Sequence, residues 1–123
     1  MRILAFVLII GAVGCQNPEQ VNPVVYTLET QAIGQTSATF IGNLQDPGVS
    51  NILTYGFVWS ETANPNVVTG NLIVLGERDV AGEFSALQEG LAAGTTYYVR
   101  AFVSDANFSS ITYANVEDFT TLR

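Results

Sequence analysis

The sequence predicts an all-β fold in which seven short strands form an antiparallel β-sandwich. Runs of β-branched and aromatic residues alternate with polar ones, and turn signals separate these runs about every 8–12 residues. No segment after Gly14 shows sustained helical periodicity. The clearest strand covers 97–103, and Leu91 lies six residues before its first residue, Tyr97. This spacing is typical of a tyrosine corner, in which the phenol holds the preceding loop in place.

Each expected strand lies between residues that favour turns. In chain order the strands are 24–30, 37–44, 52–60, 71–75, 82–87, 97–103 and 111–121. Asp-Pro-Gly at 46–48 ends the second strand and Asn-Pro-Asn at 64–66 follows the third, because these residues favour the backbone angles of turns. Gly76 ends the fourth strand, and a polar loop over 105–110 separates the last two.

The alternation of side chains identifies the expected core. In strand 97–103, Tyr97 and every second residue after it face inward, because successive side chains of a strand point to opposite faces. In the last strand we expect Ile111, Tyr113 and Phe119 to point inward. The residues expected to build the structural core are Phe57, Trp59, Leu91, Tyr97 and Phe119.

The composition excludes several classes of function. The chain has 123 residues, of which 48% are hydrophobic, so it can bury one core of ordinary size. Four arginines stand against 11 acidic residues, and the net charge is -7. Such a surface repels phosphate, so we expect neither nucleic acid nor an anionic membrane as an electrostatic partner. The chain has no histidine, which removes the commonest general base and the commonest metal ligand.

The first 15 residues indicate where the protein is sent. Arg2 precedes an apolar run over 3–13, which is too short to span a bilayer and matches the helical apolar region of a cleaved signal peptide. The run ends in Ala-Val-Gly-Cys at 12–15, which resembles a bacterial lipobox. The resemblance implies cleavage after residue 14 and acylation (including palmitate) of Cys15. Alternatives are an ordinary signal peptide with an incidental cysteine and an uncleaved signal anchor.

A short linker follows the signal peptide, so that 1–14 is the lipoprotein signal peptide and 15–23 the lipidated cysteine with its linker. Several acyl chains together anchor a protein stably, which makes the lipid bilayer the first expected partner. The linker reaches about 25–30 Å when extended, so we expect domain 24–123 close to the membrane. Gln16 favours the outer membrane under the sorting rule of lipoproteins, and leaves the periplasmic or surface face open.

Several short segments recur in an order typical of one domain family. They are Thr-Ser-Ala at 36–38, Tyr-Gly-Phe-Val-Trp-Ser at 55–60, Asn-Pro at 64–65, Gly-Leu at 90–91, Gly-Thr-Thr-Tyr-Tyr-Val-Arg-Ala at 94–101 and Phe-Thr-Thr at 119–121. Together they resemble the fibronectin type III-like domains of bacterial surface proteins. The resemblance covers about residues 24–121 and implies a seven-stranded immunoglobulin-like sandwich. It leaves the function open, because such sandwiches serve as adhesins, spacers and appendages of enzymes.

The outward face of strand 97–103 is the candidate binding surface. Tyr98, Arg100 and Phe102 alternate along it, and Val58 of the neighbouring strand extends the patch. An arginine between two rings favours a cation–π arrangement, and exposed apolar surface of this kind often marks a contact site. The alternative is a structural surface stripe that strand 71–75 partly covers.

The sequence contains no constellation for catalysis or metal binding. Glu117 and Asp118 are adjacent, so on a strand they point to opposite faces and cannot act as a carboxylate pair. We therefore predict a membrane-anchored extracytoplasmic lipoprotein without cofactor, which acts as a non-enzymatic binding module for a protein or carbohydrate ligand, in adhesion or ligand presentation. The alternative is a structural accessory subunit of a cell-envelope complex.

Overall fold

The computed structural model describes residues 22–48 and 52–123. The expectations for the signal peptide, for Cys15 and for most of the linker therefore lie outside the described residues. Within the described part, no helix is long and apolar enough to cross a membrane.

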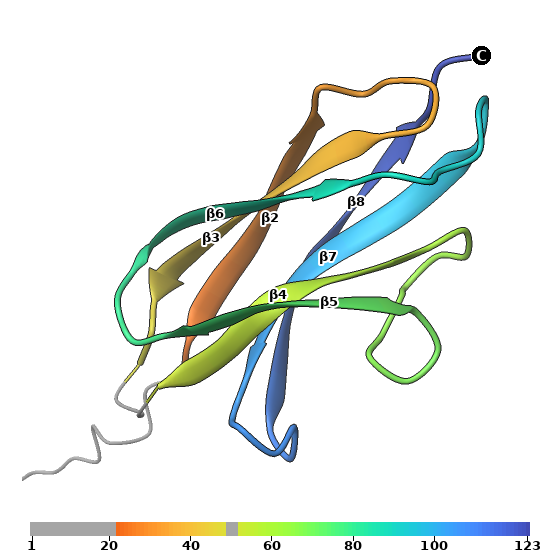
Figure 1. The fold of residues 1–123 in the computed structure, drawn as a ribbon. Coiled ribbons are helices and arrows are strands. Elements are labelled where there is room, and N and C mark those ends of the chain that lie inside the picture. Colours follow the sequence, from red (N-terminus) through yellow and green to blue (C-terminus); the bar gives the residue numbers. More distant parts are fainter. Residues whose placement is uncertain (1–21, 49–51) are drawn as a thin grey trace, which may run out of the picture.

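Seven strands form two antiparallel sheets that pack face to face (Figure 1). The strands are β2 (Val24–Gln31), β3 (Ala38–Asp46), β4 (Leu53–Ser60), β5 (Asn71–Arg78), β6 (Gly82–Gln88), β7 (Thr96–Ser104) and β8 (Ile111–Thr120). One sheet has the order β2-β3-β6 and the other the order β5-β4-β7-β8. All seven expected strands are present. The fourth is longer than expected, because the chain continues as a strand through Gly76 to Arg78.

Strand pairing places the connections at two opposite ends of the sandwich. At the end where β2 begins, Val24 pairs with Asp46, Leu53 with Arg78, and Ser104 with Ile111. We call this the N-terminal end; it carries the connections β3–β4, β5–β6 and β7–β8. The other end, which we call the C-terminal end, carries the connections β2–β3, β4–β5 and β6–β7 together with residues 121–123 (Figure 1).

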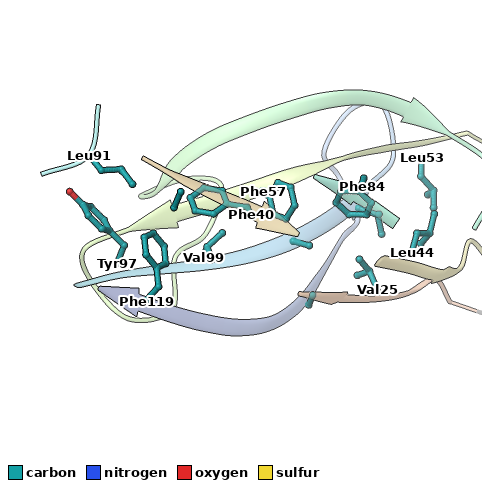
Figure 2. Packing of buried hydrophobic residues seen from close by; sticks show 14 residues of the cluster. Val25, Phe40, Leu44, Leu53, Phe57, Phe84, Leu91, Tyr97, Val99 and Phe119 are labelled. Atoms are coloured by element: carbon teal, nitrogen blue, oxygen red, sulfur yellow. The ribbon is translucent and has the colours of Figure 1, made fainter. Parts of the chain in front are cut away.

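The core lies between the sheets and is largely aromatic. Phe40 packs against Phe57 and Phe119 with ring centroids 5.7 and 5.8 Å apart, and Phe84 lies 5.3 Å from Phe57. Figure 2 shows this row of rings, with Tyr97 and Leu91 at one end and Leu53 and Leu44 at the other. Each fully buried side chain of this size contributes about 1.5–3 kcal/mol.

The predicted core residues lie where alternation places them. Phe57, Leu91, Tyr97 and Phe119 are buried in the central cluster. Trp59 is half-buried and packs at the margin of that cluster, where its ring lies 5.5 Å from Tyr97 in an edge-on arrangement.

The tyrosine corner forms at the C-terminal end. The Tyr97 hydroxyl accepts a hydrogen bond from the Ala92 N–H at 2.8 Å, which ties the β6–β7 connection to the strand that follows it. Backbone hydrogen bonds hold the same end together: the Leu91 N–H donates to the Thr36 carbonyl and the Gly94 N–H to the Leu122 carbonyl. This end is therefore built from three connections and the last residues of the chain.

A β-bulge reverses the expected orientation of the first half of β8. Arg100 of β7 pairs with Val116, but Phe102 pairs with Tyr113, so β8 has one more residue than β7 across this step. Because the extra residue shifts the alternation, Phe119 points inward while Ile111 and Tyr113 share the outward face of the sheet. The expectation that Ile111 and Tyr113 point into the core is therefore wrong, and Ala114 takes the inward position.

A polar clasp closes one side of the sandwich at this bulge. The Thr27 N–H donates to the Asn115 carboxamide oxygen at 2.8 Å, and the Asn115 amide donates to the Thr27 carbonyl at 2.9 Å. The Thr27 hydroxyl in turn accepts a hydrogen bond from the Ala101 N–H at 2.8 Å. The Asn115 side chain thus occupies the place of a neighbouring strand and joins the edge strands β2 and β8.

Candidate functional site

The outer face of the four-stranded sheet holds the predicted binding patch. The register defines two rows of side chains across this face. One row runs Leu72, Val58, Arg100 and Val116, and the other runs Val74, Gly56, Phe102 and Tyr113. The sequence prediction was right that Val58, Arg100 and Phe102 share one face, and Tyr98 follows on the same side of β7.

Arg100 is fixed by the protein itself rather than presented to a ligand. Its Nε and one terminal nitrogen donate to the Ala114 carbonyl at 3.0 and 2.8 Å, at the bulge of β8. Its guanidinium carbon lies 4.8 Å from the centre of the Tyr113 ring. The predicted cation–π contact therefore exists, but the ring comes from β8 and not from Tyr98 or Phe102. Tyr98 and Arg100 are both half-buried.

Phe102 does not line an open surface, which corrects the sequence prediction. It has no exposed area, and the ring of Phe108 packs against it with centroids 5.8 Å apart. Phe108 belongs to the β7–β8 connection and adopts a left-handed backbone with φ of 58°. Asp105 holds this loop by accepting hydrogen bonds from the N–H groups of Ser109 and Ser110.

Val58 is also fully buried, and the expectation of an exposed patch is wrong for it too. The β4–β5 connection covers it: a Cβ on Gly70 would lie only 2.6 Å from a Val58 methyl group, and Pro65 of the same connection is fully buried. The Val67 N–H donates to the Tyr113 hydroxyl at 3.0 Å, which ties this connection to β8. Two connections thus close over the central residues of this face.

At the β5 side of this face, apolar side chains are exposed. Leu72 and Val74 are 43% and 51% exposed, and Leu75 beside them is also exposed. Within residues 22–48 and 52–123, β5 pairs with β4 alone, so its outer side is a sheet edge. These three residues, which we call the β5 edge, form the candidate interaction site.

The backbone of the β5 edge is available for pairing. The Ile73 carbonyl points at Gly56 of β4, where a Cβ would lie only 1.9 Å from its oxygen. In an antiparallel sheet, the backbone N–H and C=O groups of successive residues point to opposite sides of the strand. Because those of Ile73 point towards β4, those of Leu72 and Val74 point away from it. An edge strand of this kind is a template for a further strand.

The surroundings of the β5 edge are acidic. Glu77, Asp79 and Glu83 follow it along the chain and are exposed. The nearest arginine, Arg78, is turned to the interior, with its guanidinium carbon 5.0 Å from the ring centre of Tyr55 and 5.7 Å from that of Phe84. An apolar strand beside exposed carboxylates favours an apolar ligand with positive charge.

The described residues offer no metal site. No group of three or more potential ligands among His, Cys, Asp and Glu comes together in residues 22–48 and 52–123. The Ser109 hydroxyl, and then backbone N–H groups of the same loop, lower the pKa of Asp105.

Comparison with known proteins identifies the fold. The chain matches no family model and no curated protein. Its structure is similar to the sensor domain of the anti-sigma factor RsgI4 in Pseudobacteroides cellulosolvens, with a TM-score of 0.58, 20% identity, and coverage of 81% of this chain and 89% of that one. It is also similar to the fibronectin type-III domain of human fibronectin type III domain containing protein 3, with a TM-score of 0.57, 12% identity, and coverage of 82% and 87%.

A third similar structure is the fibronectin type III domain derived from the human KIAA0970 protein, with a TM-score of 0.55, 15% identity, and coverage of 85% of this chain and 77% of that one. The seven antiparallel strands in two sheets therefore form a fibronectin type III-like sandwich. This confirms the predicted fold class.

Proposed function

We propose that this protein is an extracytoplasmic lipoprotein, anchored through acylated Cys15, whose sandwich domain is a non-enzymatic binding module. The observation that carries the proposal is the β5 edge, where a strand with one sheet partner exposes three apolar side chains in a chain with an excess of acidic residues. The lipobox-like segment at 12–15 supports the anchor. A sandwich of the same fold is the sensor domain of RsgI4, which supports recognition as the role of this one.

The ligand that best fits the β5 edge is an extended polypeptide. Such a segment adds to the sheet through main-chain hydrogen bonds to Leu72 and Val74, and its alternate side chains pack against theirs. A carbohydrate ligand fits less well, because the exposed side chains of this edge are aliphatic and offer no ring for a sugar to stack on. The acidic surroundings favour a segment that carries Lys or Arg.

A permanent partner would make the protein a structural accessory subunit of an envelope complex instead. The same edge serves both roles, since strand addition supports transient recognition as well as stable assembly. The two differ in stoichiometry: an accessory subunit copurifies with one partner in a fixed ratio, whereas a binding module does not.

The binding role is tested by charging the β5 edge. The double variant Leu72→Lys/Val74→Lys keeps the strand but places two ammonium groups where an apolar segment would pack. Val68→Lys/Leu122→Lys is the matched control, because both residues are exposed at the C-terminal end and the charge change is the same. We expect crosslinking in intact cells to yield a partner that the control retains and the β5 variant loses; equal crosslinking by both variants contradicts the role of this edge.

The anchor is tested separately with Cys15→Ser. We expect the wild-type protein in the membrane fraction and the variant in the soluble extracytoplasmic fraction, because the variant has no thiol to acylate. A variant that remains membrane-bound shows that the anchor is not a lipid on Cys15.

A further inference from the structure

We infer that the N-terminal end of the sandwich rests on the bilayer surface and inserts the side chains of Ile52 and Val80 into the interfacial region. This inference rests on the proposed lipid anchor. It adds a second membrane contact, made by the folded domain, and it fixes which end of the domain faces outward.

The first argument is the position of two exposed apolar residues. Ile52 and Val80 are 54% and 60% exposed. Ile52 directly precedes Leu53, which pairs with Arg78, and Val80 lies two residues beyond Arg78, so both stand at the N-terminal end just past the last pair of β4 and β5. Apolar side chains at loop positions are suited to insertion between lipid headgroups, because burial there removes them from water.

The second argument is where the tether joins the domain and how long it is. The chain enters the sandwich at Val24, the first residue of β2, and the strand pairing places Val24 at the same end as Ile52 and Val80. From Cys15 to Val24 an extended chain spans about 30 Å. The strands β2 and β8 have 8 and 10 residues, so the sandwich is itself about 26–34 Å long. Bringing the C-terminal end to the membrane would need the tether to run the full length of the domain without slack.

Because the tether is short, a weak contact with the bilayer is sufficient to orient the domain. Linking the domain to the bilayer confines it within the reach of the tether, which gives the apolar side chains a high effective concentration of membrane. Two side chains that would not hold a free domain on a vesicle then suffice to orient a tethered one.

The charge of this end selects the lipid. Asp46, Asp79 and Asp105 lie in or beside its three connections, while Arg78 is stacked on interior rings. Carboxylates are repelled by anionic headgroups, so the contact favours a zwitterionic surface. β5 begins at the C-terminal end of the sandwich, and Leu72 and Val74 lie in its first half, so the β5 edge stays clear of the bilayer in this orientation.

The test uses the acylated full-length mature protein in phosphatidylcholine vesicles. Acylation of the chain's one cysteine leaves no other thiol, so Ile52→Cys or Val80→Cys gives a single site for an environment-sensitive fluorophore. Val68→Cys is the matched control, because Val68 is 85% exposed and lies in a connection of the C-terminal end. Brominated lipids then report which labels reach the bilayer.

We expect the labels at 52 and 80 to shift their emission to shorter wavelengths and to be quenched several-fold more than the label at 68. In vesicles that contain phosphatidylglycerol this difference should shrink. Protein that floats with the vesicles but shows equal quenching at 68 and 80, or no quenching at any site, overturns the inference and leaves the anchor intact. Protein that does not float with the vesicles overturns the proposed anchor itself.

Discussion

The two sides of the sandwich differ in whether their edge strands are joined by hydrogen bonds or left open. On one side, the Asn115 carboxamide bonds both backbone groups of Thr27 and joins β8 to β2. On the other side, β5 and β6 each have one sheet partner among the described residues, β4 and β3, and β5 exposes Leu72, Val74 and Leu75. Proteins usually protect such an edge with lysine, proline or a covering segment, because an open edge recruits other chains. β5 contains neither lysine nor proline, and its bulge and its charged residues Glu77 and Arg78 come after Leu72 and Val74, so the exposure of these two residues is the feature that a binding role explains.

This difference shows that one side chain can bind the backbone groups that a neighbouring strand would otherwise bind. A carboxamide carries a donor and an acceptor at a spacing that matches a peptide group, so Asn115 satisfies Thr27 without a further strand. The β5 edge has no such residue, and its outward backbone groups remain available to a partner.

We expect the largest loss of stability from Gly56→Ala, at the position where β4 contacts β5. The new Cβ would lie 1.9 Å from the Ile73 carbonyl oxygen and 2.9 Å from its carbon, so β5 has to move away from β4. We expect a loss of about 3 kcal/mol in the free energy of unfolding, measured by urea denaturation. Amide exchange should accelerate in β5 more than in β8.

Gly34→Ala is the control for Gly56→Ala. Its Cβ would lie 3.4 Å from the Ser37 hydroxyl, and its stability should change by less than about 1 kcal/mol. A Gly56→Ala protein with the wild-type urea midpoint would show that β5 is not packed as closely on β4 as described.

The next largest effect is expected at the closed edge, from Asn115→Ala. The change removes both bonds to Thr27 and leaves its N–H and carbonyl without partners, which costs about 2 kcal/mol. Asn43→Ala is the matched control, because Asn43 lies on a strand and its side chain makes no hydrogen bond within the described residues; it should change stability by less than about 0.5 kcal/mol. Equal losses in both variants would mean that the clasp contributes nothing specific.

A smaller effect is expected at the tyrosine corner, which lies at the end away from the proposed membrane contact. Tyr97→Phe keeps the buried ring but removes the hydroxyl that accepts from the Ala92 N–H. We expect a loss of about 1 kcal/mol in thermal or urea unfolding. Tyr26→Phe removes a hydroxyl from a ring that is 44% exposed and should be neutral; a neutral Tyr97→Phe would contradict the structural role of the corner.

The sequence was sufficient to predict the strands and most of the core. Period-2 alternation and turn residues are local signals, and they placed Phe57, Tyr97 and Phe119 correctly. The inward orientation of Tyr113 failed because the bulge of β8 depends on pairing with β7, and no local signal in 111–121 separates a bulged strand from a regular one.

The candidate site was only partly predictable. Alternation correctly put Val58, Arg100 and Phe102 on one face, but it says nothing about what folds over that face. Two residues carried a signal that could have been used: Phe108 is an aromatic residue in an otherwise polar loop, and Pro65 lies in the connection that covers Val58. The β5 edge was missed because its exposure depends on which strand ends the sheet.

We expect the smallest change in stability from a substitution of Asp105, which lies in the β7–β8 connection that covers Phe102. Hydrogen bonds from the Ser109 hydroxyl, then from the Ser110 N–H, hold the pKa of this carboxyl below its ordinary value of 3.8. A carboxyl whose pKa is lower in the folded state stabilises the fold above its unfolded pKa, and this contribution disappears as the pH falls through the folded value.

Asp105→Asn should therefore lower the urea midpoint slightly at about pH 6, by less than Tyr97→Phe, and the difference from wild type should shrink as the pH falls below 3.8. Glu83→Gln is the control for loss of one exposed negative charge. If the Asp105 difference instead persists unchanged at the lowest pH, the carboxylate charge is not what orders the loop, and the cover over Phe102 depends on the packing of Phe108 alone.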